Sequence, residues 1–453
     1  MSSKVQHKNF KGSALSGAMM YAGLGLLGLG GALTIGTYVS DSGRFWSHAV
    51  IAFMFLLSLG LGGLFYVALE YLVGAFWSVP VRRINEAMSG FLYPLTVIGL
   101  LITVITIFYA GHSSPYHHWL PAPHGAHHGA GGHGDKAHHG EKKAHGDSHA
   151  KDAHAKTDKG ADSHAKEGGH DDHGAHGHDP IIESKRWWLT EMRFFVAVCI
   201  CFFFWLLFRH FFVSQSRKQD VTGDHKITLR SSQVAAPFML VFAGTISIAA
   251  VNWLMTIEPH WFSTMFGVYY FAGTLVSSAA LLTIMSVILR EGGFLHPKLQ
   301  RDSYYSLGLM LFAFNTFWAY IAFSQFMLIW YANLPEETMW FVARYEGGWM
   351  YMSLFMILFH FAIPFFALLS RTQKTNPNRL LFMSMWLLVA HYMDLYWVVM
   401  PANPHGGFGL TDIGFVLFAS GFVLFFFSFF AQKASLTPEK DPKLAHALEF
   451  RLH

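Results

Sequence analysis

The chain has 453 residues, of which 53% are hydrophobic and 13% are charged, and its mean hydropathy is +0.32. Soluble domains typically carry about 25% charged residues, so this composition excludes a soluble globular protein and predicts that lipid surrounds the chain. The formal net charge of +4 comes from basic residues spread over several loops, and it therefore indicates no nucleic-acid partner.

Apolar runs follow one another along the chain, and each is long enough to cross roughly 30 Å of hydrocarbon as a helix. The ten predicted spans are 14–38, 46–73, 88–110, 191–213, 233–256, 264–289, 303–332, 348–370, 378–400 and 411–431. The alternating segments of about ten residues that form a membrane barrel are absent from the sequence. We therefore predict an all-α polytopic membrane protein of about ten transmembrane helices.

The predicted spans divide the chain into four segments. Residues 1–110 hold an N-terminal tail and the first three helices, 111–190 form a loop, 191–432 hold the remaining seven helices, and 433–453 form a C-terminal tail. The first span follows several lysines but lacks a small-residue cleavage site, so we expect it to remain as an uncleaved anchor.

The basic residues predict the orientation of the chain, because short cytoplasmic loops are enriched in Lys and Arg. An even number of spans places both termini on one side, and that side collects nineteen basic residues against two on the other. The nineteen are Lys4, Lys8, Lys11, Arg82, Arg83, Arg217, Lys218, Lys226, Arg230, Arg290, Lys298, Arg301, Arg371, Lys374, Arg379, Lys433, Lys440, Lys443 and Arg451, and the two are Arg44 and Arg344. We predict cytoplasmic termini and a loop at 111–190 on the outer side.

Histidine dominates that outer loop, which holds seventeen of the 28 histidines in the chain. The loop has almost no apolar residues with which to build a core, so we expect disorder across most of it. Clustered imidazoles bind zinc, nickel or copper loosely, but a defined site needs fixed geometry. The weak metal candidates are His127, His128, His138, His139, His170, His173, His176 and His178.

Ionisable residues inside predicted spans are the main candidates for function, because a charge at mid-membrane is costly and usually faces the bundle interior. His360 lies in the eighth span, and His391 with Asp394 lies in the ninth. His391 and Asp394 are three residues apart and share a helix face, so a proton can pass between them. The alternative is that these histidines only hydrogen-bond a neighbouring helix.

Further candidates for a proton path lie near the ends of spans. Glu70, toward the cytoplasmic end of the second span, is a candidate for proton uptake. His48, Glu258 and His260 lie at the outer boundary and are candidates for proton exit. The alternative for all four is an ordinary interfacial residue whose polar end reaches the headgroups.

Glycine and cysteine carry no cofactor signal in this sequence. The strings GLGLLGLGG and GLGLGG lie inside apolar runs with no preceding strand, so they favour close helix packing over nucleotide binding. Cys199 and Cys201 are the only cysteines and lie on different faces of one predicted helix. The sequence has no haem-attachment motif and no iron–sulfur cysteine set, so we expect no cofactor in this chain.

A weak internal repeat relates the two halves of the membrane region. The fifth span ends with NWLMTIEPHWF and the ninth with LYWVVMPANPHGGF, and in each a Trp precedes a Pro-His pair by a few residues. Spans two to five and six to nine are therefore candidates for parallel four-helix repeats.

Three long strings resemble a known family. FLLSLGLGGLFYVALEYLVGAFWSVPVRRINEAM, NWLMTIEPHWFSTMFGVYYFAG and HYMDLYWVVMPANP are similar to the F subunit of alternative complex III, the bacterial quinol:cytochrome c or high-potential acceptor oxidoreductases. The resemblance covers nearly all ten spans but not the histidine-rich loop. It implies an NrfD-like, polysulfide-reductase-like membrane subunit with two four-helix bundles and flanking helices, in a bacterial inner membrane.

The resemblance also implies partners. These are a homologous NrfD-like subunit that binds quinol, multihaem and monohaem cytochrome c subunits, an iron–sulfur protein and membrane lipids, with a terminal oxidase as a further candidate. The chain would scaffold the quinol-oxidising subunit and provide proton half-channels. The c-type haems and iron–sulfur clusters would lie in the partner subunits. The proton-path residues named above come from the sequence pattern and not from the family.

Two other functions remain open. One is an NrfD-like subunit with its own quinone site, using Glu258 near His260 at the Trp-rich boundary. The other is a metal-cation transporter whose histidine-rich loop collects cations. A transporter predicts His and Asp ligand pairs on facing helices at mid-membrane, and His391 with Asp394 is the nearest approach to such a pair.

Overall fold

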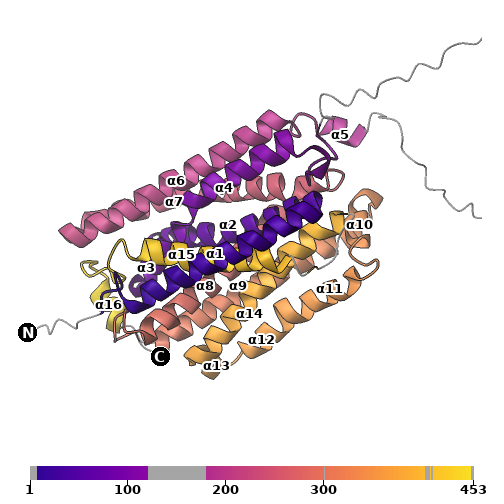
Figure 1. Cartoon of the computed structure of the whole chain (residues 1–453). Helices are drawn as coiled ribbons and strands as arrows, with labels where there is room; N and C mark the ends of the chain where they lie inside the picture. Colours follow the sequence, from indigo (N-terminus) through magenta and orange to yellow (C-terminus); the bar gives the residue numbers. More distant parts are fainter. Residues whose placement is uncertain (1–7, 121–179, 300, 404–408, 410–411, 450–453) are drawn as a thin grey trace, which may run out of the picture.

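The computed structural model describes residues 8–120, 180–299, 301–403, 409 and 412–449. These residues form helices and no strands, and ten helical segments are long and apolar enough to cross a membrane (Figure 1). The predicted fold class, an all-α polytopic membrane protein, is therefore confirmed.

The long helices are α1 (Ala14–Ser40), α2 (Ser42–Val73), α4 (Leu92–Val104), α6 (Glu191–Thr222), α7 (His225–Trp253), α8 (Phe266–Glu291), α9 (Arg301–Ala332), α14 (Pro377–Val399) and α15 (Ile413–Ala431). Shorter helices are α3 (Arg82–Ser89), α5 (Pro180–Ser184), α10 (Pro335–Val342), α11 (Trp349–Met356), α12 (Ile363–Ala367), α13 (Arg371–Thr375) and α16 (Leu444–Glu449). The short α3 continues into α4 to make the third span, and α11 continues into α12 to make the eighth.

The membrane helices form two four-helix bundles. Helices α2, α4, α6 and α7 pack together in the first, and α8, α9, the α11–α12 segment and α14 pack together in the second. Helix α2 is the first helix of one bundle and α8 is the first of the other, and the two pack against each other at the centre of the molecule. In each of them 94% of the most apolar 18-residue stretch is buried. This grouping matches the predicted repeats of spans two to five and six to nine.

Helices α1 and α15 form a flanking pair through close glycine contacts. A Cβ atom added at Gly30 would lie 2.5 Å from the backbone nitrogen of Phe418, and one at Gly23 would lie 2.6 Å from that of Phe425. Only glycine permits this backbone approach. Gly23 and Gly30 of the first span therefore pack helices, as the sequence predicts, whereas a Cβ atom at Gly25, Gly28 or Gly31 would meet nothing within 4 Å.

Both ends of the described chain lie at the same end of the molecule, which we call the terminal face (Figure 1). Helices α3, α13 and α16 lie at this face, and α5 and α10 lie at the opposite end, which we call the distal face. This arrangement agrees with an even number of spans.

The structure differs from the sequence prediction at the start of the third span. The prediction begins at residue 88, whereas helix α3 already begins at Arg82 and the whole span covers Val79–Tyr109. The charged residues just before the predicted apolar run, Arg82, Arg83 and Glu86, are buried in this helix. They are tolerated there because they pair with one another and with carboxylates of α2, α6 and the C-terminal tail, as described below.

The two ends of the predicted outer loop are ordered. Tyr116 and Trp119 are buried, the Tyr116 hydroxyl donates to the Trp253 carbonyl at 3.0 Å, and the Trp119 indole donates to the Thr256 carbonyl at 3.0 Å. Aromatic packing therefore fixes residues that follow α4, a stretch that the hydropathy pattern assigns to the loop. Residues 121–179 lie outside the described part of the chain.

Candidate functional site

Asp394 lies in the interior of the second bundle, on α14. Its side chain is buried and accepts hydrogen bonds from the Tyr269 hydroxyl on α8 and, at 3.2 Å, from the Trp318 indole on α9. Both donors are neutral groups. A carboxyl group deep in the bundle and held by neutral donors is suited to gain and lose a proton, because these donors do not lock it in its charged form as a paired cation would.

His391 extends the polar contacts of Asp394 toward the centre of the molecule. Its Nδ1 lies 4.0 Å from an Asp394 oxygen, and its Nε2 lies 3.2 Å from the Ser58 hydroxyl on α2. Ser58 is in turn 3.2 Å from the Ser277 hydroxyl on α8. The imidazole fits beside Gly273, where a Cβ atom would lie 2.6 Å from the ring. The predicted pair thus joins a buried polar chain that links both bundles, with a gap of 4.0 Å between His391 and Asp394, where the His391 Nδ1 has no hydrogen-bond partner among the described residues.

His360 lies beside this chain but not in it. The residue is fully buried in a π-helical turn, Ile357–Ala362, and its ring centroid lies 3.6 Å from that of Trp318. Within the described part of the chain neither of its ring nitrogens has a hydrogen-bond partner. π-helical turns occur frequently at functional sites, and buried polar side chains without a partner are uncommon. Its contact with Trp318 places His360 next to a donor to Asp394.

A large cavity opens beside Asp394. It has a volume of about 630 Å³ and lies between α8, α9, the α10–α11 region and α14. Its lining is aromatic and apolar except for a few groups that include Asp394, Tyr269, Gln325 and Arg344. The Gln325 carbonyl oxygen is buried and lacks a hydrogen-bond partner among the described residues. The cavity therefore combines apolar walls with a few polar groups, of which the Gln325 oxygen is unsatisfied by the residues that the structure describes.

Arg344 forms the distal-face wall of this cavity. It is 1% exposed, its guanidinium lies 3.0 Å from a Glu258 carboxylate oxygen, and its Cζ lies 3.4 Å from the Trp340 ring centroid. Burial lowers the pKa of Arg344 to about 10, although Glu258 acts in the opposite direction. In the sequence Arg344 counts only as a loop residue. The signal that could have marked it is that an Arg on the outer side runs against the positive-inside bias.

The three predicted exit residues have different partners in the structure. Glu258 pairs with Arg344, and the His260 carbonyl lies 3.4 Å from the Lys185 ammonium. His48 is buried, with its Nε2 3.2 Å from an Asp412 oxygen. The structure therefore links Glu258 to the aromatic cavity and assigns His48 to a different pair.

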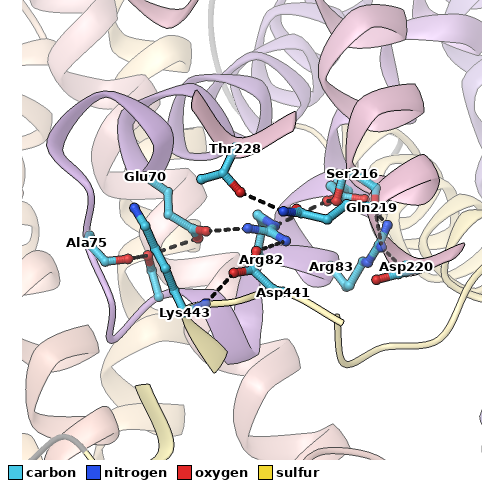
Figure 2. A network of polar contacts seen from close by, with 12 residues as sticks. Glu70, Ala75, Arg82, Arg83, Ser216, Gln219, Asp220, Thr228, Asp441 and Lys443 are labelled. Carbon is cyan, nitrogen blue, oxygen red and sulfur yellow. Dashed lines mark hydrogen bonds and ion pairs between the residues drawn. The ribbon is translucent and has the colours of Figure 1, made fainter. Parts of the chain in front are cut away.

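Glu70 belongs to a second polar site, at the terminal face (Figure 2). Its carboxylate is buried and lies 2.9 Å from the Arg82 guanidinium, which also lies 2.7 Å from the Asp441 carboxylate of the C-terminal tail. Arg83 pairs with Glu86 at 2.6 Å and with Asp220. We call these six residues, Glu70, Arg82, Arg83, Glu86, Asp220 and Asp441, the arginine–carboxylate cluster. Glu70 is the one member that the sequence pattern singles out as a candidate.

The described residues offer no metal centre, since no three His, Cys, Asp or Glu side chains among them converge on one point. His117 and His118 have ring centroids 4.0 Å apart. Burial lowers the pKa of His118, and the neighbouring His117 and His260 lower it further. The weak metal candidates between His127 and His178 lie outside the described residues.

Comparisons with protein-family models and with curated proteins find no match to this chain.

Proposed function

We propose that this chain is a membrane subunit of a respiratory quinol:acceptor oxidoreductase of the alternative complex III type. The three extended strings in its spans support the family, and its two four-helix bundles with a flanking helix pair agree with what the family implies. The excess of basic residues on the side of the termini supports cytoplasmic termini and a periplasmic histidine-rich loop in a bacterial inner membrane.

In this proposal the chain carries no redox cofactor of its own. Quinol is oxidised in a homologous NrfD-like neighbour, and electrons pass through c-type haems and iron–sulfur clusters in the other subunits. This chain supports the neighbour and conducts protons released or taken up during the reaction.

The buried polar chain carries the proton-conducting part of the proposal. Contacts of 3.2 Å join Ser277, Ser58 and His391. Asp394, which accepts from Tyr269, follows across a gap of 4.0 Å from the imidazole. Imidazole, carboxyl and hydroxyl groups each accept and donate protons, so a series of them inside a membrane marks a proton path. On the distal side the cavity continues from Asp394 to Arg344 and its partner Glu258. The chain thus has the layout of a half-channel toward the distal face.

Asp394→Asn tests this role in proteoliposomes that contain the whole complex. The asparagine keeps the size of the side chain, and its single amide oxygen still accepts from one of the two donors, Tyr269 or Trp318, but it cannot carry a proton. We expect quinol oxidation to continue with fewer protons released per electron. Glu183→Gln, which removes an exposed carboxylate of the distal face, is the control and should leave the ratio unchanged. An unchanged ratio in Asp394→Asn would contradict proton conduction and leave a scaffolding role.

The cavity favours a second candidate function, a quinone site within this chain. Its volume of about 630 Å³ and its aromatic walls suit a lipid-soluble ring. Tyr320 and Phe323 line it and are 64% and 61% exposed on the outer surface of the bundle, which lipid would cover. Ala322→Trp should narrow the cavity and abolish labelling of this chain by a photoreactive quinone in the intact complex. Unlabelled wild-type chain would contradict this second function.

A further inference from the structure

The arginine–carboxylate cluster contains more acids than bases. Four carboxyl groups, Glu70, Glu86, Asp220 and Asp441, face two guanidinium groups, Arg82 and Arg83. Each residue except Asp220 is at most 5% exposed, and the Asp220 side chain is 24% exposed. If every carboxyl group were ionised, the cluster would carry two uncompensated negative charges. Buried groups in this situation take up protons instead.

Helix α6 supplies one further cation, Arg209, which is 5% exposed and lies 4.2 Å from the Tyr93 ring centroid. Its guanidinium interacts electrostatically with Glu86 and offsets one of the two charges, so one negative charge remains. The three lysines of the C-terminal tail make other contacts. The Lys440 ammonium lies 2.7 Å from the Val221 carbonyl, the Lys443 ammonium 5.6 Å from the Phe76 ring centroid, and the Lys433 ammonium 4.2 Å from the Phe429 ring centroid. Helix α6 contributes the Ser216 hydroxyl, which donates to Glu86 at 2.6 Å. From α2 the Tyr71 ring lies 5.1 Å from the Arg82 guanidinium carbon. Protonation of a carboxyl group is the remaining way to offset the charge.

Of the buried carboxyl groups in the cluster, Glu70 is the one least stabilised as an anion by the two arginines. Its guanidinium partner, Arg82, is shared with Asp441 at 2.7 Å and with Glu86 at 3.6 Å. Glu86, by contrast, contacts both arginines. Asp441 also accepts from the backbone N–H of Lys443 at 2.8 Å. The proton is therefore best placed on Glu70.

The Ser78 hydroxyl gives a separate indication. Its oxygen lies 2.9 Å from the second Glu70 carboxyl oxygen and 3.3 Å from the Ala75 carbonyl. Both neighbours are acceptors when Glu70 is ionised, and a hydroxyl has one proton to give. When Glu70 carries a proton it donates to Ser78, and Ser78 donates to Ala75, so that both contacts are satisfied.

Buried polar atoms without a partner among the described residues adjoin the cluster. They include the Arg83 Nε and the Tyr71 hydroxyl, in residues that are each 3% exposed. Such atoms are usually satisfied by ordered water. Water there would give a proton on Glu70 a way to exchange with the terminal face.

We propose that Glu70 keeps its proton at neutral pH and makes the arginine–carboxylate cluster a proton-storing site at the terminal face, with Asp441 of the C-terminal tail supplying the negative charge that holds the proton. Its use in proton transfer rests on the proposed function above. The protonation itself does not, and it can be measured without turnover.

Infrared spectroscopy of the complex in lipid nanodiscs tests this directly. The wild type should show the C=O stretching band of a protonated carboxylic acid at neutral pH, and the band should shift in heavy water. Glu70→Gln should remove it. Asp441→Asn should also remove it, although Glu70 is still present, because the three remaining carboxylates are then balanced by Arg82, Arg83 and Arg209 without a proton. Glu183→Gln at the distal face should leave it unchanged.

Two results would overturn the proposal. One is an identical acid band in the wild type and in Glu70→Gln, and the other is a Glu70 band that persists in Asp441→Asn. Glu70→Asp, which preserves the acid, guards against misfolding and should retain a shifted band. A failure of the Asp394→Asn proton-release experiment would leave all these spectra unaffected, so the two proposals fail independently.

Discussion

Asp412, just outside the last span, is held as an anion by its neighbours. Burial alone would raise its pKa, but hydrogen bonds from His48 and Arg44 and from the Gly409 N–H outweigh this and lower the pKa to about 2. Arg44 and His48 belong to α2, and Asp412 directly precedes α15. The contact therefore ties the flanking helix pair to the first bundle.

Asp412→Asn should destabilise the folded chain by about 1.5–3 kcal/mol, the range for a hydrogen bond to a charged group. Because the folded pKa lies below that of an unfolded aspartate, about 3.9, this stabilisation is complete above pH 4 and is lost as the pH falls toward 2. Thermal unfolding in nanodiscs at neutral and acidic pH measures both effects. Glu183→Gln, in an exposed ion pair, should change little, and equal melting temperatures of the two variants would contradict the assignment.

Individual residues show what sequence could and could not predict about the candidate site. His391 and Asp394 were identifiable because they interrupt an apolar run three residues apart. Tyr269 and Trp318 were not, because aromatic residues are common in this chain and nothing in their spacing shows that they contact Asp394. Asp441 lies in the tail, far from any span, and only folding brings it to Arg82.

At the scale of elements, α1 and α15 depend on glycine for their close approach. Gly30→Leu should strain the pair by about 1–3 kcal/mol, the usual cost of an overpacked contact, because its Cβ would meet the α15 backbone at 2.5 Å. Gly28→Leu is a matched control, since a Cβ there meets nothing within 4 Å. Thermal unfolding of both variants measures the difference. Equal stability would contradict the packing described here.

Helix boundaries were predictable where hydrophobicity ends sharply and not where charges pair. Helix α3 begins within a charged stretch that the hydropathy pattern leaves outside the third span, because the Arg82 and Arg83 partners come from elements distant in the sequence. The π-helical turn around His360 was likewise not foreseeable, since its sequence reads as an ordinary apolar helix.

At the scale of the whole molecule, span number and grouping followed from the sequence because lipid imposes length and apolarity on every spanning helix. The two bundles each contribute to the candidate site: α2 provides Ser58, and α8, α9 and α14 provide Tyr269, Trp318, His391 and Asp394. Helix α3, which carries Arg82 and Arg83 of the second polar site, lies at the terminal face, and α10, which ends two residues before Arg344, lies at the distal face (Figure 1). This layout agrees with the proton transfer that we propose for this chain.

The central claim is that this chain works inside a respiratory complex with haem-bearing partners. Purification of the tagged full chain from its native membrane in mild detergent, followed by absorbance spectroscopy before and after reduction, tests it most directly. Since the sequence has no haem-attachment motif, c-type haem bands that co-migrate with the chain in a stable complex are the predicted result. A chain that purifies intact and without haem would contradict the account.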